Sequence, residues 1–183
     1  MSAGSDNRSS EDPVVPRSVA VIMDGTGRWA QKAGFERIRG HERGIDAVRT
    51  TVTECARLGV EALVLYAFSG EKWARPKREI DMLFKLLKRF LADERGTLMD
   101  NDVRLLHSGR RERLSADVLR LIDETIELTS KNDGMRLSLA ISYGGRQELI
   151  DATQRLAREV ASGKLAPEAI DEQAIRGALY QPS

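Results

Sequence analysis

Two loops carry the residues whose types and spacing could do chemistry. The first, Asp24-Gly-Thr-Gly-Arg-Trp-Ala30, follows an apolar run and leads into a short helical segment. Free backbone N–H groups at the start of such a segment attract anions, and the Arg28 guanidinium suits phosphate oxygens. Arg37, Arg39 and His41 follow closely enough to approach the same anion. The loop is neither a GxGxxG nor a Walker A sequence, so it predicts neither a dinucleotide nor an ATP site.

Asp24 is the informative residue of this loop. A carboxylate beside a phosphate repels it unless a divalent cation lies between the two. Magnesium is commonly held by one or two carboxylates together with substrate phosphates. Aspartate is also a frequent N-cap of helices. The spacing therefore favours a magnesium ligand and a helix N-cap about equally.

The second loop, Ser69-Gly-Glu-Lys-Trp-Ala-Arg-Pro76, follows another apolar run. It offers polar and aromatic side chains at Ser69, Glu71, Trp73 and Arg75. The alternative interpretation is a solvated loop that leads into a helix started by proline. Ligands of open parallel sheets bind beyond the carboxyl ends of the strands. Two loops that each contain Trp and Arg after an apolar run therefore predict one shared site for an anionic ligand.

The elements that must position these loops alternate in type along the chain. Such alternation predicts a single α/β domain with a mainly parallel central sheet flanked by helices. We place this domain at residues 17–183, after a disordered polar tail at 1–16. Apolar runs predict strands at 18–23, 62–68, 103–107 and 135–142. Amphipathic patterns predict helices at 41–58, 77–100, 115–131, 146–161 and 167–179.

The helix predicted after Pro76 has one apolar stripe. Its members recur at steps of three and four residues, which places them on one helix face. The stripe is explained either by packing against the sheet or by a role as the wall of an apolar channel, and the pattern alone separates neither. Its residues are Ile80, Leu83, Phe84, Leu87, Phe90 and Leu91.

Composition excludes several classes of protein. The chain has 183 residues, with 29 lysines and arginines against 28 acids, and this balance argues against a polycation that coats nucleic acid. Its single cysteine, Cys55, excludes a disulfide framework and a CxxC zinc site, and we expect a core thiol there. No apolar run approaches the ~20 residues of a transmembrane helix, and the N-terminus lacks the apolar core of a signal peptide. A cytoplasmic location is therefore expected.

Several separated motifs resemble the cis-prenyltransferases, the undecaprenyl diphosphate synthase family. The resemblance begins with Val19-Ala-Val-Ile-Met-Asp-Gly-Thr-Gly-Arg-Trp-Ala30 and covers roughly residues 17 to 180. It continues in order through Gly40-His41, Gly59-Val-Glu-Ala-Leu-Val-Leu-Tyr-Ala-Phe-Ser69, Glu71, Trp73-Ala-Arg-Pro76 and Tyr143-Gly-Gly-Arg146. The resemblance implies an enzyme that condenses an allylic diphosphate, usually farnesyl diphosphate, with isopentenyl diphosphate to give cis-polyprenyl diphosphate. It also implies Mg²⁺ as cofactor, a homodimer, and peripheral membrane contact through the hydrophobic product.

The same resemblance implies roles for individual residues. Asp24 corresponds to the metal ligand and catalytic aspartate, and Lys72 stands where the family has the residue assigned to proton removal. The apolar stripe after Pro76 corresponds to the lining of the tunnel for the growing hydrocarbon. The pocket for the allylic diphosphate corresponds to Gly25, Thr26, Gly27, Arg28, Trp29, Arg37 and His41. The second loop near the reacting carbons corresponds to Ser69, Gly70, Glu71, Trp73 and Arg75.

The chain departs from the family pattern in four places. Thr26, Lys72 and Ser142 stand where the family usually has asparagine. A lysine with its ordinary pKa near 10.4 is protonated at neutral pH, so Lys72 accepts a proton only if its pKa is strongly depressed, and it could instead bind a second diphosphate. The family also continues beyond Ser183 with an arginine-rich stretch and further strands. We therefore expect a sheet short of its last strands, and as an alternative function a non-catalytic binder of allylic diphosphate or a partner subunit.

Overall fold

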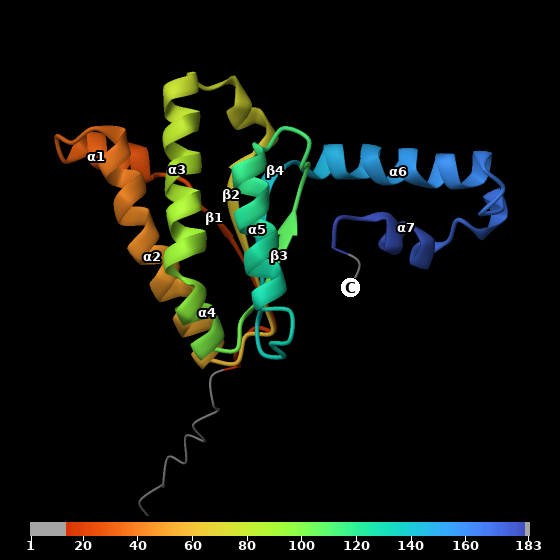
Figure 1. Cartoon of the computed structure of the whole chain (residues 1–183), viewed down its shortest axis with the longest axis horizontal. Helices are drawn as coiled ribbons and strands as arrows, with labels where there is room; N and C mark the ends of the chain where they lie inside the picture. The colour runs from red at the N-terminus through yellow and green to blue at the C-terminus, as the bar shows by residue number, and fades with distance from the viewer. Residues whose placement is uncertain (1–13, 182–183) are drawn as a thin grey trace, which may run out of the picture.

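The computed structural model describes residues 14–181 and shows alternating strands and helices (Figure 1). The predicted tail lies mostly outside these residues, and positions 14–16 form neither helix nor strand. The first half comprises β1 (Ser18–Ile22), α1 (Thr26–Lys32), α2 (Arg37–Arg57), β2 (Ala62–Ser69), the 3₁₀ helix η1 (Gly70–Ala74) and α3 (Lys77–Asp93). The second half comprises α4 (Arg95–Asp100), β3 (Arg104–Ser108), α5 (Ala116–Leu128), β4 (Arg136–Tyr143), α6 (Gly145–Ala161), η2 (Pro167–Ala169) and α7 (Glu172–Ala178).

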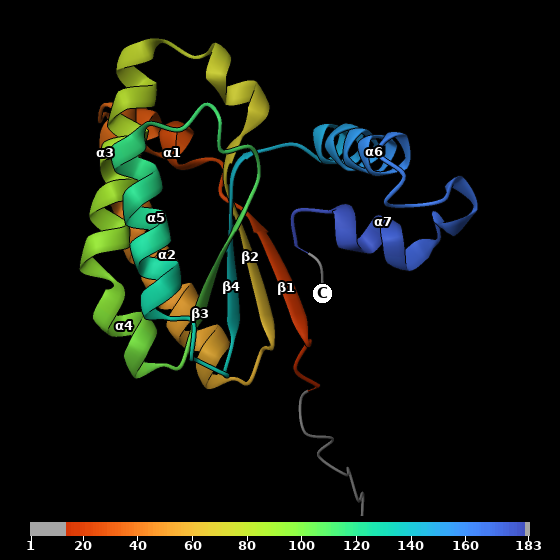
Figure 2. The same cartoon turned by 45° about the vertical axis from the view of Figure 1, so that its right-hand side comes forward.

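The four strands form one parallel sheet in the order β1-β2-β4-β3. The predicted α/β class with a parallel central sheet is thereby confirmed. Within the described residues β1 pairs with β2 alone, so β1 is one edge of the sheet. Figure 2 shows α1 to α5 on one side of the sheet, with α6 and α7 on the other side. The segments after β1, β2 and β3 contain helices that return the chain to the start of another parallel strand, as crossover connections require.

The core lies between the sheet and helices α2, α3 and α5. Leu63 and Leu65 of β2 and Leu137 and Ile141 of β4 are almost wholly buried there. Six consecutive positions of β4 are buried, as expected for a strand covered on both faces, whereas in β2 the exposed Val64 lies between the buried Leu63 and Leu65. Cys55 packs against this cluster, where burial raises the pKa of its thiol, in agreement with the predicted core position.

The observed boundaries differ from the predicted ones in three helices. The predicted helix 77–100 is divided at Glu94, whose φ of −92° and ψ of 1° interrupt the helical backbone. Glu94 is only 2% exposed, and its carboxylate accepts a hydrogen bond from Arg49 Nε at 2.8 Å. This contact lowers the pKa of Glu94. The helix predicted to start at residue 41 starts earlier, at Arg37, and the segment 167–179 is divided into η2 and α7.

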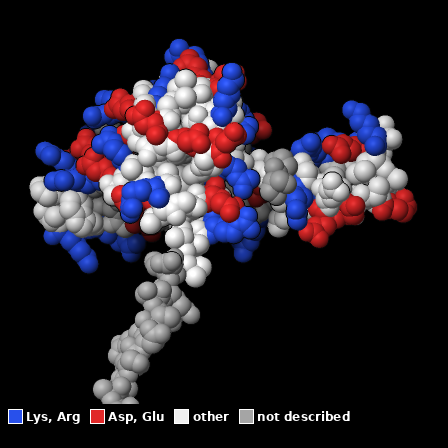
Figure 3. All heavy atoms as spheres, turned by 90° about the horizontal axis from the view of Figure 1, so that it is seen from below, with Lys and Arg blue, Asp and Glu red and all other residues white. Residues whose placement is uncertain are grey.

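Helices α6 and α7 form an arm that projects from the carboxyl end of β4 (Figure 1). The arm has a small core of its own at Ala152, Leu156 and Ala178. A bidentate ion pair between Arg110 and Asp151, with bonds of 2.8 and 2.6 Å, ties α6 to the segment after β3. On the face shown in Figure 3, positive and negative side chains are interspersed over the body and the arm. No helix among residues 14–181 has the length and apolarity needed to cross a bilayer.

The close packing of α1 on α2 depends on a glycine. A Cβ built on Gly40 would lie 2.1 Å from the carbonyl oxygen of Thr26 and 3.1 Å from Cβ of Ala30. We expect Gly40→Ala to lower the free energy of unfolding by about 1 to 3 kcal/mol, because the two helices must separate. The matched control is Gly96→Ala in α4, where a Cβ meets no atom within 4 Å. At this position alanine should raise the free energy of unfolding by up to about 1 kcal/mol, because it favours a helix more than glycine does. Urea titration of both variants measures these free energies. Equal changes in Gly40→Ala and Gly96→Ala would contradict the prediction.

His107 on β3 predicts an acid-dependent loss of stability. Burial, followed by the positive charge of Arg111, lowers the pKa of His107 from 6.5 to about 4, and within residues 14–181 its buried Nε2 atom has no hydrogen-bond partner. Below pH 6.5 the unfolded chain binds a proton that the folded chain binds only near pH 4. Stability is therefore lost as the pH falls from 6.5 to 4, by about 2 to 3 kcal/mol at pH 4.5. Between pH 7 and pH 4.5, the free energy of unfolding measured by urea titration should fall by that much less in His107→Gln than in the wild type. Equal losses in the two proteins would show that His107 is not the group responsible.

Candidate functional site

The two predicted loops meet at the carboxyl edge of the sheet. Asp24 follows β1, and η1 follows β2 directly. Because β1 and β2 are parallel neighbours, their carboxyl ends lie side by side. A cavity of about 230 Å³ lies there, between the first loop, α2, α3 and η1. Residues of both loops thus line one cavity.

One end of this cavity is polar and mostly positive. It is lined by one carboxylate, four cationic side chains and an imidazole, so the arrangement suits an anion. The residues are Asp24, Arg28, Arg37, His41, Lys72 and Arg75.

Asp24 is exposed to the cavity and ionised. Its side chain is 67% exposed, with Oδ1 accepting from the Gly25 N–H at 2.7 Å and Oδ2 accepting from Arg28 at 3.2 Å. The Gly25 hydrogen bond, and then the charge of Arg28, lowers the pKa of Asp24. The N-cap alternative is wrong, because the N-cap of α1 is Gly25, with a left-handed φ of 92° and no side-chain cap.

Asp24 fits a magnesium site that the ligand completes. Residues 14–181 contain no group of three or more His, Cys, Asp or Glu side chains that could hold a metal ion alone. A cation at Asp24 would therefore take most of its oxygen ligands from a bound diphosphate and from water. Magnesium tolerates this arrangement, because it keeps several waters and binds through one or two carboxylates plus phosphates.

The glycines of the first loop let arginine approach. A Cβ built on Gly27 would lie 2.9 Å from Nε of Arg37, so a larger residue would displace that guanidinium. Arg37 is the first residue of α2, and it lines the cavity together with Arg28. The pattern Gly-Thr-Gly therefore positions a second guanidinium that comes from nine residues further along the chain than Arg28.

His41 has a ring nitrogen available to a ligand. Thr26 Oγ1 lies 3.1 Å from Nδ1 of His41, and this contact fixes the ring orientation. The Nε2 atom is buried and has no hydrogen-bond partner among the described residues, and His41 lines the cavity. Burial lowers the pKa of His41, so the ring is neutral at pH 7 and can donate one N–H. A ligand oxygen would satisfy this buried polar atom.

The second loop contributes two cations to the cavity. Lys72 donates from Nζ to the carbonyl oxygen of Ala67 at 3.3 Å, and burial lowers the pKa of its ammonium group. Arg75 donates to Glu79 Oε1 at 2.5 Å, an i,i+4 pair that holds the guanidinium near the cavity. The Trp73 ring stacks on Phe84 with a centroid distance of 5.4 Å. The loop is thus anchored at several points, unlike a freely solvated loop.

The other end of the cavity is apolar, and the stripe of α3 has both of its predicted roles. Leu83, Phe84, Leu87 and Phe90 line the cavity, whereas Leu91 is buried in the core. Sequence reasoning missed the walls from the strands and from α2, namely Leu65, Phe68, Leu139, Ile141, Ile45 and Val48. The spacing of Ile45 and Val48 from His41 was a usable signal, because residues four and seven apart share a helix face.

Some predicted site residues lie outside this cavity. Trp29 is half exposed and lines a second cavity of about 400 Å³, which also includes Phe35 and Phe90. Glu71 is exposed, and neither it nor Trp73 is among the lining residues of the polar cavity. Gly25, Ser69 and Gly70 are not among the lining residues either, although each lies within two residues of one in the chain. The lining residues among those predicted are Asp24, Thr26, Gly27, Arg28, Arg37, His41, Lys72 and Arg75.

Curated relatives share this sequence over most of the chain. It is 45% identical over 166 residues to an isoprenyl transferase of Geobacter sulfurreducens and 46% identical over 159 residues to one of Chlorobaculum tepidum. The matches cover 91% and 87% of this chain and 68% and 60% of those proteins. It is also 41% identical over 170 residues to a ditrans,polycis-undecaprenyl-diphosphate synthase of Vibrio cholerae, described as specific for (2E,6E)-farnesyl diphosphate, covering 93% and 68%.

Solved structures share the fold. A lavandulyl diphosphate synthase from Lavandula x intermedia, in complex with dimethylallyl diphosphate, has a TM-score of 0.87 at 30% identity and covers 90% of this chain and 70% of that one. A probable undecaprenyl diphosphate synthase from Campylobacter jejuni has a TM-score of 0.70 at 33% identity, covering 91% and 70%. A family model described as putative undecaprenyl diphosphate synthase matches residues 22–183. The chain therefore belongs to the undecaprenyl diphosphate synthase family of prenyltransferases.

Proposed function

We propose that the protein condenses an allylic diphosphate, such as farnesyl diphosphate, with isopentenyl diphosphate to give a cis-polyprenyl diphosphate. The observation that carries this proposal is one cavity with a cationic end and an apolar end. An allylic diphosphate has the same division, since a charged head is joined to a hydrocarbon tail. On the resemblance to the family, the proposal includes a homodimer, a cytoplasmic location and membrane contact through the product.

The cationic end is suited to the bond that must break. As the allylic C–O bond weakens, negative charge builds up on the departing diphosphate. Arg28 and Arg37 line the cavity, and the Nε2 atom of His41 has no hydrogen-bond partner among the described residues. Donors held in place in this way stabilise the developing charge with little rearrangement. These three side chains are therefore proposed to bind the allylic diphosphate.

Asp24 is proposed to hold Mg²⁺ against the same diphosphate. Its lowered pKa keeps the carboxylate charged at neutral pH, and its exposure leaves it accessible to an ion. The chemistry that a bound Mg²⁺ supplies is neutralisation of charge on the diphosphate. Without a cation, Asp24 would repel that group.

The apolar end is proposed to receive the hydrocarbon tail. Leu83, Phe84, Leu87 and Phe90 of α3 face Leu139 and Ile141 of β4 across the cavity. Burying the five carbons of one isoprene unit is worth a few kcal/mol, at ~0.8 kcal/mol for each methylene-sized group. An apolar wall therefore favours a longer tail at each addition.

Lys72 is proposed to contact a diphosphate rather than to accept a proton. Burial, and then the charge of Arg75, lowers the pKa of its ammonium group, while the Asp24 and Glu79 carboxylates oppose that shift. Lys72 lines the cavity, and its Nζ atom donates to the carbonyl oxygen of Ala67. Two relatives support the ligand class: the Vibrio cholerae synthase is described as specific for farnesyl diphosphate, and the lavandulyl diphosphate synthase was crystallised with dimethylallyl diphosphate.

The Asp24→Ala variant tests the metal bridge. Calorimetric affinity for farnesyl diphosphate should rise at least tenfold with Mg²⁺ in the wild type and should be insensitive to Mg²⁺ in the variant. In EDTA the variant should bind at least as tightly as the wild type, because a repelling carboxylate has gone. The control is Asp81→Ala, an exposed carboxylate on α3 outside the cavity. If Asp24→Ala keeps the Mg²⁺ response, Asp24 does not hold the cation against the diphosphate. If the wild type binds farnesyl diphosphate without turnover, the non-catalytic alternative is favoured instead.

The Lys72→Gln variant tests whether Lys72 contacts a diphosphate or accepts a proton. If Lys72 contacts a diphosphate, the calorimetric affinity of Lys72→Gln for the diphosphate substrate should fall about threefold to tenfold. This is the loss expected for a charge-assisted hydrogen bond that remains partly solvated. The loss should shrink at high salt, because added ions screen the interaction. Lys85→Gln, an exposed lysine on α3, is the matched control. Unchanged affinity with abolished turnover would instead identify Lys72 as the proton acceptor.

A further inference from the structure

The segment after β3 reaches the second loop, although sequence analysis assigned it no role. Gly109 has a φ of +127°, and a Cβ built on it would lie 2.2 Å from the carbonyl oxygen of Ile141. The backbone N–H of Arg110 donates to the carbonyl oxygen of Ser142 at 3.2 Å. The segment is thereby held close against the end of β4. Four residues further along the chain from Gly109, the guanidinium of Arg113 lies 4.6 Å from the ring centroid of Trp73.

Ser142 is the point where these segments converge. Its Oγ accepts a hydrogen bond from Nε1 of Trp73 at 3.0 Å, while its carbonyl accepts from Arg110. Ser142 is only 4% exposed and has a φ of +56°, which is uncommon for a residue with a side chain. Such a conformation persists where the surroundings determine it, and at this position the contacts link η1, β4 and the segment after β3.

Trp73 connects this junction to the cavity. Its ring packs edge-on against Phe68 at 5.0 Å and stacks on Phe84 at 5.4 Å, and both phenylalanines line the cavity. Lys72 and Arg75, the two cations of the second loop, lie one and two residues from Trp73 in the chain. A shift of the Trp73 ring would therefore move both cations and one apolar wall.

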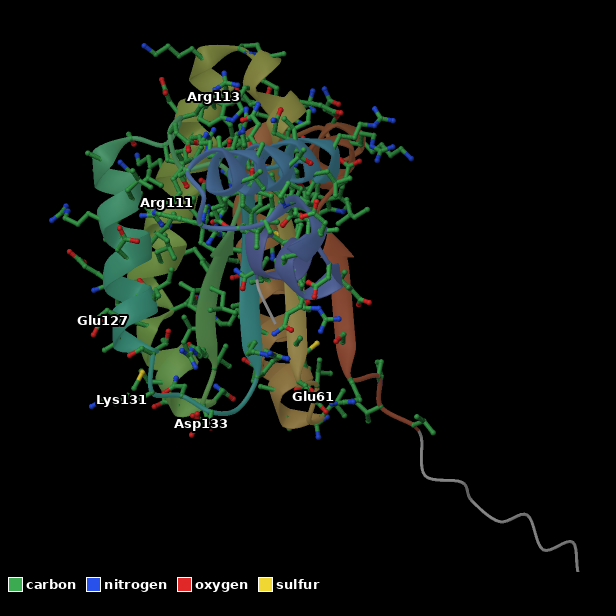
Figure 4. All side chains as sticks on the ribbon, turned by 90° about the vertical axis from the view of Figure 1, so that its right-hand side faces the viewer. Glu61, Arg111, Arg113, Glu127, Lys131 and Asp133 are labelled. Atoms are coloured by element: carbon green, nitrogen blue, oxygen red, sulfur yellow. The ribbon has the colours of Figure 1, made fainter. Side chains whose placement is uncertain are left out.

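Arg113 differs from the two arginines that precede it. Arg110 forms an ion pair with Asp151, and Arg111 forms one with Asp123. Among residues 14–181, Arg113 forms no carboxylate ion pair, and the contact that it makes is with the face of Trp73. Figure 4 shows Arg113 at the upper end of the molecule, and Asp133 at the opposite end, before β4. Arg113 is thus at the same end of the sheet as the second loop.

We propose that Arg113 is a positioning residue that holds Trp73, and through it Lys72 and Arg75, in the geometry that binds the diphosphate. The expected effect on diphosphate binding rests on the proposed function, whereas the contact between Arg113 and Trp73 does not. Arg113 lies on the face of Trp73 and is exposed, so it acts through the indole and not on the substrate. A cation over an indole face stabilises the ring position, and the Ser142 hydrogen bond fixes its rotation.

Fluorescence can report on this contact directly. The chain has two tryptophans, so in a Trp29→Phe background all indole emission comes from Trp73. Arg113→Gln in that background should shift the emission to longer wavelength and increase quenching by acrylamide, because the exposed ring face loses its cover. Arg113→Lys should restore most of both signals. The matched control is Arg111→Gln, which removes an exposed arginine two residues away and should leave both unchanged.

The functional consequence is measured by calorimetry with farnesyl diphosphate and Mg²⁺, relative to the same background. Arg113→Gln should lower affinity twofold to fivefold, the range expected for one exposed cation–π contact, and Arg113→Lys should recover most of it. Ser142→Ala should shift Trp73 emission as well, since it removes the hydrogen-bond acceptor. Emission and affinity equal to those of Arg111→Gln would overturn the proposal. If no protein binds the ligand, the proposed function fails, and the fluorescence alone decides whether Arg113 holds Trp73.

Discussion

The site depends on gathering positive charge at one end of an apolar cavity. Arg28, Arg37, Lys72 and Arg75 repel one another, and two carboxylates oppose this repulsion: Asp24, which pairs with Arg28, and Glu79, which pairs with Arg75. The Arg28 ion pair to Asp24 is exposed and therefore contributes little to stability. Stability must come from elsewhere, chiefly from the core between the sheet and its helices. The fold thus keeps these cations together so that an anionic ligand can complete the site.

Much of the fold follows from local sequence patterns. The strands are predictable because β2 and β4 are nearly continuous apolar runs, and the two loops because each follows such a run. Long-range contacts set the rest. The division of the helix at Glu94 depends on Arg49, which lies 45 residues away in the chain. No local pattern indicates that a helix will bend to satisfy a buried ion pair.

The candidate site was predictable to a similar degree. Cations and the aspartate could be identified by their types, but the direction of each side chain could not. Trp29 and Trp73 look equivalent in sequence, yet Trp29 faces a second cavity and Trp73 packs on the wall of the first. The difference arises because Trp29 lies on the outer face of a seven-residue helix, whereas Trp73 is fixed by Ser142. Tertiary packing therefore decides which aromatic residue serves the site.

Of the three positions where the resemblance implies asparagine, Thr26 and Lys72 line the cavity, and Ser142 contacts Trp73 of the second loop. Thr26 contacts Nδ1 of His41, Ser142 accepts from Nε1 of Trp73, and Lys72 donates to the carbonyl of Ala67. Each replacement therefore has a hydrogen-bond partner. Thr26 and Ser142 leave the charge unchanged, whereas Lys72 adds one positive charge where an asparagine would be neutral. Of the three, Lys72 alone therefore changes the charge of the cavity lining, and under the proposed function this added charge would attract a second phosphate group.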